Sequence, residues 1–302
     1  MSNSPQVNGL HSIDLVVADI AKTAAFYEET WGLTSVSSDA EGIFLRGSGG
    51  SPYLVRLLEG SKTTVSSINF TAPNGGVLKD LHAKVTASGM ETVSDISEIG
   101  FPGGGFGFSF KDPEGRNLRV IADASPGSAM KDDPSQPRQL SHIVLNAGTP
   151  ENSVGFFKDV LGFKTSDITG KMTFLRCCSD HHSIAITNAG GPTLNHIAFE
   201  IMDWESVMLG GGRMRDAGYP IAWGVGRHGP GNNVFAYFVG PDDVVIEYTA
   251  EVEQVDDTYK VGMPEDWTWP PGRIDQWGLS MPSKRMGEVD ASIGFEASLP
   301  QI

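Results

Sequence analysis

The chain repeats one pattern of apolar and polar positions four times, twice in each half. Each copy begins with a short apolar stretch that is typical of a buried strand, and continues through a turn into an amphipathic helical pattern. In the first and third copies the helical pattern ends in the aromatic pairs Phe26-Tyr27 and Phe156-Phe157, followed by a glycine stop. The repeat therefore predicts two halves of the same architecture.

The second and fourth copies begin with VSSINF, at residues 65–70, and LNHIAF, at residues 194–199, and each precedes a further helical pattern. Each half then ends in two strands joined by a short turn, FKDPEGRNLRVIA in the first half and FVGPDDVVIEYTA in the second. A unit of one strand, one helix and further strands, occurring four times, predicts an α+β fold of two domains.

A segment rich in Pro, Ser and Asp separates the two halves. We expect an N-terminal domain over residues 1–124, a linker over 125–138 and a C-terminal domain over 139–252. From residue 253 the periodicity fades into a Gly/Pro-rich tail, residues 253–302, with three tryptophans. This tail is predicted to pack on the C-terminal domain or on a neighbouring subunit.

Unusual polar residues mark the last strand pair of the second half. The strand VVIEY carries one carboxylate, Glu247, in an otherwise apolar run. A carboxylate in a buried strand is costly unless it is paired or binds a metal. His228 and Tyr237 precede Glu247 in the same short unit. This combination favours a metal site with acid–base partners over an ordinary core.

The repeat provides an internal comparison for this site. Three positions differ in the same way between the second and the first half: His142 against Ser12, His196 against Ser67, and Glu247 against Arg119. An arginine in place of a ligand carboxylate repels a cation, so we expect a metal in the second half and a metal-free copy in the first. Two imidazoles and one carboxylate with open positions are the ligand set of non-haem Fe(II) oxygenases, and Zn²⁺ or Mn²⁺ would also fit them.

Each of these residues also has a purely structural interpretation. A single histidine at the start of a strand is more often exposed or hydrogen-bonded, and a lone glutamate is often part of an ion pair. Tyr237 alone would be a core residue, and the pair His181-His182, before the strand SIAIT, would alone be an ordinary loop. Because His142, His196 and Glu247 occupy three equivalent positions of the repeat, we favour a metal site over these structural interpretations.

Composition narrows the class of protein. The 302 residues are 39% hydrophobic and 20% charged, as in globular proteins, and include no apolar run long enough for a transmembrane helix. We expect no signal peptide, because the first residues lack a basic and an apolar region.

Cys177 and Cys178 are adjacent, which argues against a disulfide framework and for a reducing cytoplasm. Both are interpreted as buried residues that fill space in the apolar core. A net charge of −15 argues against nucleic acid and membranes as partners.

Together these motifs resemble a known family. LSHIVL, DHHSIAI, LNHIAFE and GRHGPGNNVFAYFVGPDDVVIEYT are similar to segments of the type I extradiol ring-cleaving dioxygenases of the vicinal oxygen chelate superfamily. The resemblance covers both halves and much of the tail. It implies the glyoxalase-like fold, with paired βαβββ modules in each domain and a metal-free first domain. It also implies a cytoplasmic homo-oligomer of aromatic hydrocarbon catabolism that cleaves a catechol with O₂, using Fe(II) or alternatively Mn(II).

The resemblance further assigns roles to individual residues. The metal ligands would be His142, His196 and Glu247. The catalytic acid–base would be His182, because an alanine follows it three residues on as in the family's motif, with His181 as the alternative.

Two further residues, His228 and Tyr237, would stabilise charge on the substrate. The sequence departs from the family's pattern in the turn Gly-Pro-Asp-Asp, where Asp-Pro-x-Gly is usual, and at Ala236, where a larger apolar residue is common. The spacing of His228, Tyr237 and Glu247 is unaffected.

The substrate pocket is predicted to be apolar and to accept an uncharged catechol. The four positions that would line it are Val144, Phe174, Trp223 and Ile274. Relatives that cleave homoprotocatechuate hold its carboxylate with arginines at the positions of Trp223 and Ile274. Arg227 and Arg273 lie close in sequence and would offer an alternative site for an anion.

Two other functions remain open at this point. One is a metal-dependent lyase or isomerase of the glyoxalase type, which would work without oxygen and would not need His182, His228 and Tyr237. The other is a non-enzymatic module that binds small molecules, although such relatives usually lack the His-His-Glu set.

Overall fold

The computed structural model describes residues 7–90, 93–128, 131 and 133–300. The first half contains β1 (Gly9–Val17), α1 (Ile20–Ala25), the π-helix η1 (Phe26–Trp31), β2 (Thr34–Asp39), β3 (Gly42–Arg46), β4 (Val55–Glu59), β5 (Thr64–Thr71), α2 (Gly75–Ala87), β6 (Ser97–Glu98), β7 (Phe106–Lys111) and β8 (Asn117–Ala122). The second half contains β9 (Gln139–Asn146), α3 (Pro150–Asp159), β10 (Lys164–Ile168), β11 (Met172–Arg176), β12 (Ile184–Thr187), β13 (Thr193–Glu200), α4 (Trp204–Asp216), β14 (Trp223–Arg227), β15 (Val234–Val239), the 3₁₀-helix η2 (Pro241–Asp243) and β16 (Val245–Ala250).

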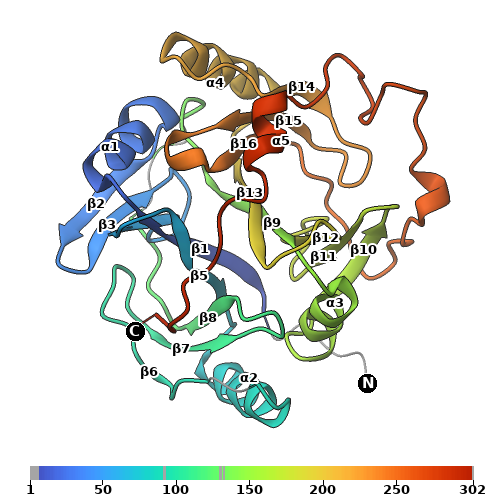
Figure 1. Ribbon diagram of the computed structural model, residues 1–302. Coiled ribbons are helices and arrows are strands. Elements are labelled where there is room, and N and C mark those ends of the chain that lie inside the picture. Colours follow the sequence, from blue (N-terminus) through green and yellow to red (C-terminus); the bar gives the residue numbers. More distant parts are fainter. Residues whose placement is uncertain (1–6, 91–92, 129–130, 132, 301–302) are drawn as a thin grey trace.

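The strands form one eight-stranded sheet in each half (Figure 1). The order is β2-β3-β4-β1-β5-β8-β7-β6 in the first sheet and β10-β11-β12-β9-β13-β16-β15-β14 in the second. Each half is therefore two βαβββ modules joined along their first strands, β1 with β5 and β9 with β13. The predicted α+β fold of paired modules is confirmed.

The repeat that the sequence predicted is reproduced in the strand register. Ser12 lies opposite Asn69, and the equivalent His142 lies opposite Ala198. Asn69 and Ala198 in turn lie beside the equivalent residues of the next strand, Arg119 and Glu247 respectively. Because the register matches residue for residue, the comparison of the two halves made from sequence is structurally valid.

Local sequence signals explain where the longer helices begin. The Asn74 side chain accepts hydrogen bonds from the backbone of Gly76 and Val77 at the start of α2, and the Asp203 side chain accepts one from Ser206 at the start of α4. Such caps satisfy amide groups that have no partner within the helix. Each helix then buries an apolar face against its own sheet.

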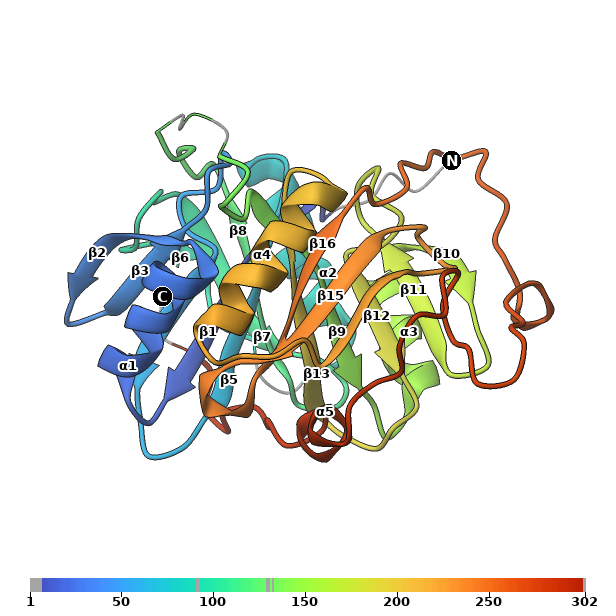
Figure 2. The same cartoon turned by 90° about the horizontal axis from the view of Figure 1, so that it is seen from above.

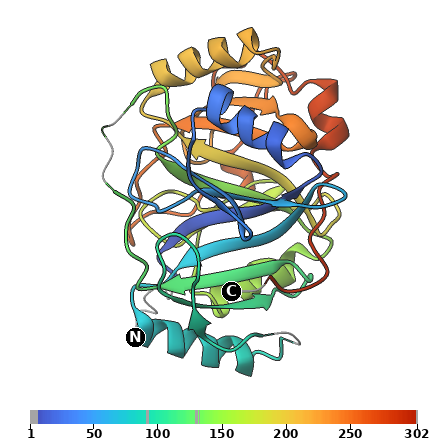
Figure 3. The same ribbon diagram turned by 90° about the vertical axis from the view of Figure 1, so that its left-hand side faces the viewer.

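Aromatic packing joins the two halves near α1 and α4, which Figures 2 and 3 show on the same side of the molecule. The rings of Trp31, from the first half, and Tyr248, from the second, stack with centroids 3.7 Å apart. The Tyr248 hydroxyl also donates to the Trp31 carbonyl at 2.6 Å, and Arg213 of α4 donates to the Thr30 carbonyl. These contacts fix the second sheet against the first.

The tail follows β16 and includes the 3₁₀-helix η3 (Pro264–Asp266) and α5 (Lys284–Val289). It runs over the second half, where Met286 and Val289 pack against Phe235 and Tyr237. It then returns to the first half, where Phe295 bridges to strand β5 and the Asn117 side chain of β8 donates to the carbonyl of Ser298. The tail thus contacts both halves.

The two adjacent cysteines differ in their exposure to solvent. Cys177 is buried, but Cys178 is exposed, so the interpretation of both as buried filler is wrong for Cys178. The reason is that the pair follows the end of β11 and lies in a bend rather than in a strand.

Within the described ranges, every helix is too short or too polar to cross a membrane.

Candidate metal centre and its pocket

Three adjacent strands of the second sheet, β9, β13 and β16, bring together His142, His196 and Glu247. The three side chains are buried, and each offers a ligand atom that lies within 4.8 Å of the others. Glu247 Oε2 lies 3.2 Å from His142 Nε2 and 3.3 Å from His196 Nε2. The residues that the sequence selected therefore converge on one point.

These three residues fit a divalent metal ion. Among the described residues, His196 Nε2 and Glu247 Oε2 are buried and have no hydrogen-bond partner, a costly arrangement without a ligand. Two ligand atoms that bind one metal at about 2.1 Å and a tetrahedral or octahedral angle are about 3.0–3.4 Å apart, which agrees with the contacts of Glu247. Two imidazoles and one carboxylate form the facial set that leaves open positions for other ligands.

A hydrogen-bonded chain directs His196 Nε2 toward this point. Asn146 donates its amide to the Asp290 carbonyl, so its own oxygen accepts from Asn195. The Asn195 oxygen is thereby directed at His196 Nδ1, 2.8 Å away, and accepts the proton carried there. Neutral His196 then has its lone pair on Nε2, as a metal ligand requires.

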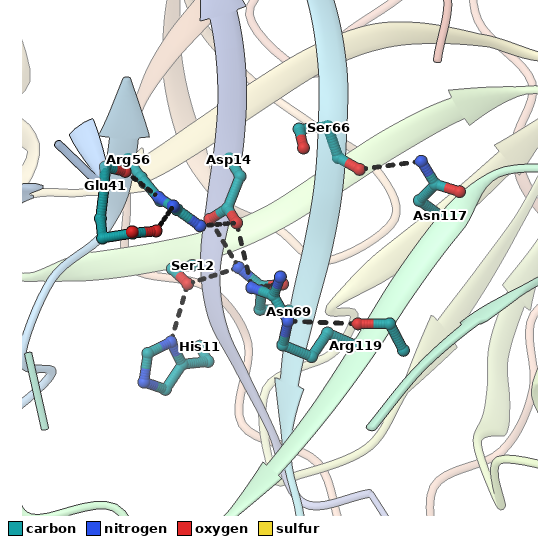
Figure 4. Close-up of polar contacts among 10 residues, drawn as sticks. His11, Ser12, Asp14, Glu41, Arg56, Ser66, Asn69, Asn117 and Arg119 are labelled. Atoms are coloured by element: carbon teal, nitrogen blue, oxygen red, sulfur yellow. Dashed lines mark hydrogen bonds and ion pairs between the residues drawn. The ribbon is translucent and has the colours of Figure 1, made fainter. Parts of the chain in front are cut away.

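The equivalent place in the first half is filled by a buried cation (Figure 4). Arg119, at the position of Glu247, donates to Asp14 at 3.0 Å, and Asp14 also accepts from Asn69 at 2.8 Å. The position of His142 is taken by Ser12, which accepts from Asn69 at 2.9 Å. A guanidinium paired with a carboxylate here provides charge balance without a metal.

A cavity of about 390 Å³ opens beside the three candidate ligands. Its size suits a small aromatic molecule. Nine of the residues to which the sequence gave a role in the site line it: His142, Val144, Phe174, His182, His196, Trp223, His228, Tyr237 and Ile274.

The two neighbouring histidines occupy different environments. His182 lines the cavity, and its ring lies 4.2 Å from that of His142 and 5.1 Å from that of Phe174, measured between centroids. Burial, together with the neighbouring imidazoles, holds the pKa of His182 well below its usual value. His181 lies behind it, fully buried, with Nε2 bonded to Asp167 at 2.8 Å. Of the two, His182 is the one that lines the cavity.

On the opposite wall His228 and Tyr237 form a pair, with Nε2 and the phenol oxygen 2.9 Å apart. Burial lowers the pKa of His228 to about 4, and burial raises the pKa of Tyr237 well above its usual value. Both side chains are therefore neutral near pH 7. Neutral polar groups that line a cavity can donate to oxygen atoms of a bound molecule.

Several pocket residues were missed from the sequence. Trp267 and Trp269, from the irregular tail, lie over Gly229, where an added Cβ would come within 2.7 Å of the Trp269 ring. Lys171, exposed in the turn before β11, brings a cation to the cavity. The tryptophans follow no periodic pattern, and nothing in the local sequence distinguishes this lysine from others.

Arg227 and Arg273 are engaged elsewhere, although the sequence named them as possible anion sites. Arg227 is paired with Glu251 and lies over the Trp277 ring, and Arg273 donates to the Asp275 carbonyl. Neither arginine lines the cavity.

Several known proteins are similar to this chain in sequence. The model of the Glyoxalase/Bleomycin resistance protein/Dioxygenase superfamily matches residues 139–248. Metapyrocatechase 2 of Cupriavidus necator is 27% identical over an alignment of 316 positions, gaps included. The alignment covers 94% of this chain and 94% of the relative. An iron-dependent extradiol dioxygenase of Rhodococcus jostii is 24% identical, over 73% of this chain and 81% of the relative.

A solved structure extends the likeness to the whole fold. The Mn(II)-bound glyoxalase from Novosphingobium aromaticivorans is 36% identical, with a TM-score of 0.87, and the match covers 93% of this chain and 94% of that one. The fold of this chain therefore agrees with that of this solved relative. The chain belongs to the glyoxalase/bleomycin resistance protein/dioxygenase superfamily, also called the vicinal oxygen chelate superfamily, and within it resembles the extradiol dioxygenases.

Proposed function

We propose that this chain cleaves the ring of a catechol beside its two hydroxyl groups, with O₂ and a divalent metal ion held by His142, His196 and Glu247. The observation that carries the proposal is one cavity in which this ligand set faces His182 on one side and the His228–Tyr237 pair on the other. A metal ion alone would suffice for many lyases. The additional acid–base and donor groups match the needs of a dioxygenase.

Iron is the metal we propose, with manganese as the alternative, because relatives are described with each. A divalent ion at this site supplies Lewis acidity, which acidifies a catechol hydroxyl, and a meeting point for the diol and dioxygen. The buried Glu247 carboxylate offsets part of the positive charge of the ion.

The chain's own residues would handle protons and charge. Neutral His182 takes a proton from a catechol hydroxyl and returns it later in the cycle. His228 and Tyr237 hydrogen-bond to the ring oxygens as negative charge develops on them. Trp267 and Trp269 cover the cavity on the tail side and reduce the access of water.

An uncharged, apolar-substituted catechol is the substrate class that the pocket supports. Val144 and Phe174 form one apolar wall with Ala185. Trp223 adds apolar surface on the opposite wall, stacked on Tyr237 with ring centroids 5.1 Å apart. A planar substituent would bury apolar surface against these side chains, whereas a carboxylate would lose its hydration there.

A glyoxalase-type lyase or isomerase is the second candidate, because a solved relative at 36% identity is described as a glyoxalase. Such an enzyme shares the metal centre but does not consume oxygen. Its substrate would be a small thiol adduct or a similar compound rather than an aromatic diol.

Oxygen uptake separates the candidates. The purified protein, loaded anaerobically with Fe(II) and in parallel with Mn(II), is mixed with catechol and 3-alkyl- or aryl-catechols while O₂ and visible absorbance are recorded. We expect one O₂ per catechol and a yellow ring-opened product. A loaded protein that consumes no oxygen with any catechol, yet isomerises a hemithioacetal, would establish the second function. The Glu247→Gln variant, treated with the same metal, is the control for activity of free metal.

A further inference from the structure

A buried chain of three side chains runs from β10 to the cavity. Asp167 Oδ2 lies 2.8 Å from His181 Nε2, and His181 Nδ1 lies 3.1 Å from His182 Nδ1. Asp167 and His181 are fully buried, and His182 is 3% exposed. We propose that Asp167 and His181 are positioning residues that fix the proton of His182 on Nδ1 and leave its Nε2 as the base. This inference rests on the proposed function, in which His182 is the acid–base group.

The protonation pattern follows from the donor and acceptor capacity of each group. A carboxylate only accepts, so the proton between Asp167 and His181 belongs to His181 Nε2. When His181 carries this proton alone, its Nδ1 is unprotonated and can only accept. The contact between the two Nδ1 atoms is a hydrogen bond only if His182 donates. His182 Nε2 is the nitrogen that remains, and it carries the lone pair.

The same pattern holds after proton uptake. A cationic His182 carries protons on both nitrogens, so its Nδ1 still donates to His181. A base whose hydrogen bond is kept in both protonation states needs no rearrangement during catalysis.

The surroundings hold the three side chains in place. Asp167 Oδ1 accepts from the backbone amide of Gly262 in the tail at 2.7 Å, which fixes the plane of the carboxylate. The backbone amide of His181 donates to the Glu253 carbonyl at 2.9 Å. Gly231, at φ +77°, packs against both imidazoles, and a Cβ there would lie 3.0 Å from His182 and 3.2 Å from His181. Three segments distant in sequence thus converge on the chain.

The variant Asp167→Asn tests this arrangement with almost no change in shape. Because the Gly262 amide donates to Oδ1, the asparagine oxygen stays on that side and its NH₂ group faces His181. His181 Nε2 must then accept, its Nδ1 must donate, and His182 must accept at Nδ1 and carry its proton on Nε2. The substitution thus inverts the tautomers of both histidines and removes the base.

We expect Asp167→Asn to lower kcat by about 10²–10⁴-fold, because a wrong tautomer has a cost of this size in other acid–base sites. KM for the catechol and bound metal should remain near the wild-type values. Tyr259→Phe is the matched control: it removes the longer contacts of the phenol oxygen to Asp167, at 3.3 and 3.4 Å, but keeps the ring that packs on His181, and its kcat should stay within about threefold of wild type.

A spectroscopic measurement is independent of turnover. With only seven histidines in the chain, ¹⁵N NMR of histidine-labelled protein loaded with diamagnetic Zn(II) can report each tautomer. We expect His182 to be protonated on Nδ1 in the wild type and on Nε2 in Asp167→Asn. The inference is overturned if the variant keeps the Nδ1 proton or keeps wild-type kcat. If the wild type cleaves no catechol but shows the expected tautomers, the proposed function fails and the positioning of His182 stands.

Discussion

Arg119 and Glu247 occupy the same position in the two halves and carry opposite charges. Arg119 lies beside Asn69 in the first sheet as Glu247 lies beside Ala198 in the second, and both side chains are fully buried. Arg119 is paired with Asp14 at 3.0 Å, whereas the carboxylate of Glu247 faces two imidazoles. The same strand position therefore carries a buried cationic side chain in the first half and a candidate metal ligand in the second half.

This contrast predicts one metal ion per chain, bound in the second half. His196→Ala or Glu247→Gln should abolish metal binding, because each removes one of three ligands from a buried site. Metal content after anaerobic loading and desalting, measured by elemental analysis, checks the prediction. Two metal ions per chain in the wild type, or one retained in both variants, would contradict it.

Arg119→Met should destabilise the protein without affecting metal content. The substitution leaves Asp14 buried with its other cation, Arg56, at 3.6 Å, and removal of one partner of a buried ion pair typically costs about 3–5 kcal/mol. We expect a loss of about 3 kcal/mol in the free energy of unfolding, measured by urea denaturation. Arg285→Met, which breaks an exposed ion pair with Asp243, is the control and should cost less than about 1 kcal/mol. Equal effects of the two variants would refute this role for Arg119.

The comparison between the halves was accessible from sequence because the two copies keep the same register. His142 and Ser12 could be aligned through their apolar neighbours, and the structure keeps that alignment in space. The α+β class followed from the same repeat. Val144 and Trp223, which the resemblance to the family placed in the substrate pocket, line the cavity, and their role in substrate binding stays a prediction.

The remaining parts of the site had no local signal. Asp167 lies at an irregularity in the pairing of β10 with β11, and a single aspartate in such a stretch is ordinary in sequence. Its importance comes from two distant partners, His181 and Gly262. Trp267 and Trp269 reach the cavity through a tail without periodicity, and side-chain contacts of that kind depend on the tertiary fold alone.

His11 should make the protein sensitive to acid. Burial lowers the pKa of His11 to about 4, and its ring is 4% exposed. Below the ordinary histidine pKa of about 6.5, His11 binds a proton in the unfolded chain but stays neutral in the folded protein. The free energy of unfolding therefore decreases as the pH falls from about 6.5 to about 4. This shift corresponds to about 2–3 kcal/mol at pH 4.5.

The variant His11→Phe keeps the ring contact with Tyr53 and removes the titrating group. The fall in unfolding free energy between pH 7 and pH 4.5, measured by urea denaturation, should be smaller in the variant by that amount. The comparison cancels the other buried histidines, which are present in both proteins. An identical fall in both proteins would show that His11 does not titrate as inferred.

His182→Phe should separate catalysis from metal binding. The phenyl ring can pack near Phe174 as the imidazole does, but it neither accepts nor donates a proton. We expect kcat to fall by about 10²–10⁴-fold while the metal content and the Kd for a catechol stay close to wild type. His82→Phe, in the first half, is the control and should keep its activity. Loss of metal in His182→Phe would instead identify His182 as a ligand.

The charge of the substrate is the last property that the pocket predicts. Its inner walls are formed by Val144, Phe174 and Trp223, and burial of an unpaired carboxylate against them costs several kcal/mol. The cation that lines the cavity, Lys171, is exposed, so its attraction for an anion is screened by water and salt. We therefore expect kcat/KM for an alkyl- or aryl-catechol to exceed that for homoprotocatechuate by tenfold or more at fixed salt.

Lys171→Met tests the lysine that, among the described residues, lines the cavity. If Lys171 contributes little, the variant should change the ratio of the two kcat/KM values by less than about fivefold, because an exposed charge pair is worth at most about 1 kcal/mol. Catechol, without a substituent, is the reference for general effects on activity. A tenfold preference for homoprotocatechuate in the wild type would refute the apolar pocket. Loss of that preference in Lys171→Met would then identify the lysine as its carboxylate partner, and its persistence would direct attention to Arg227 and Arg273.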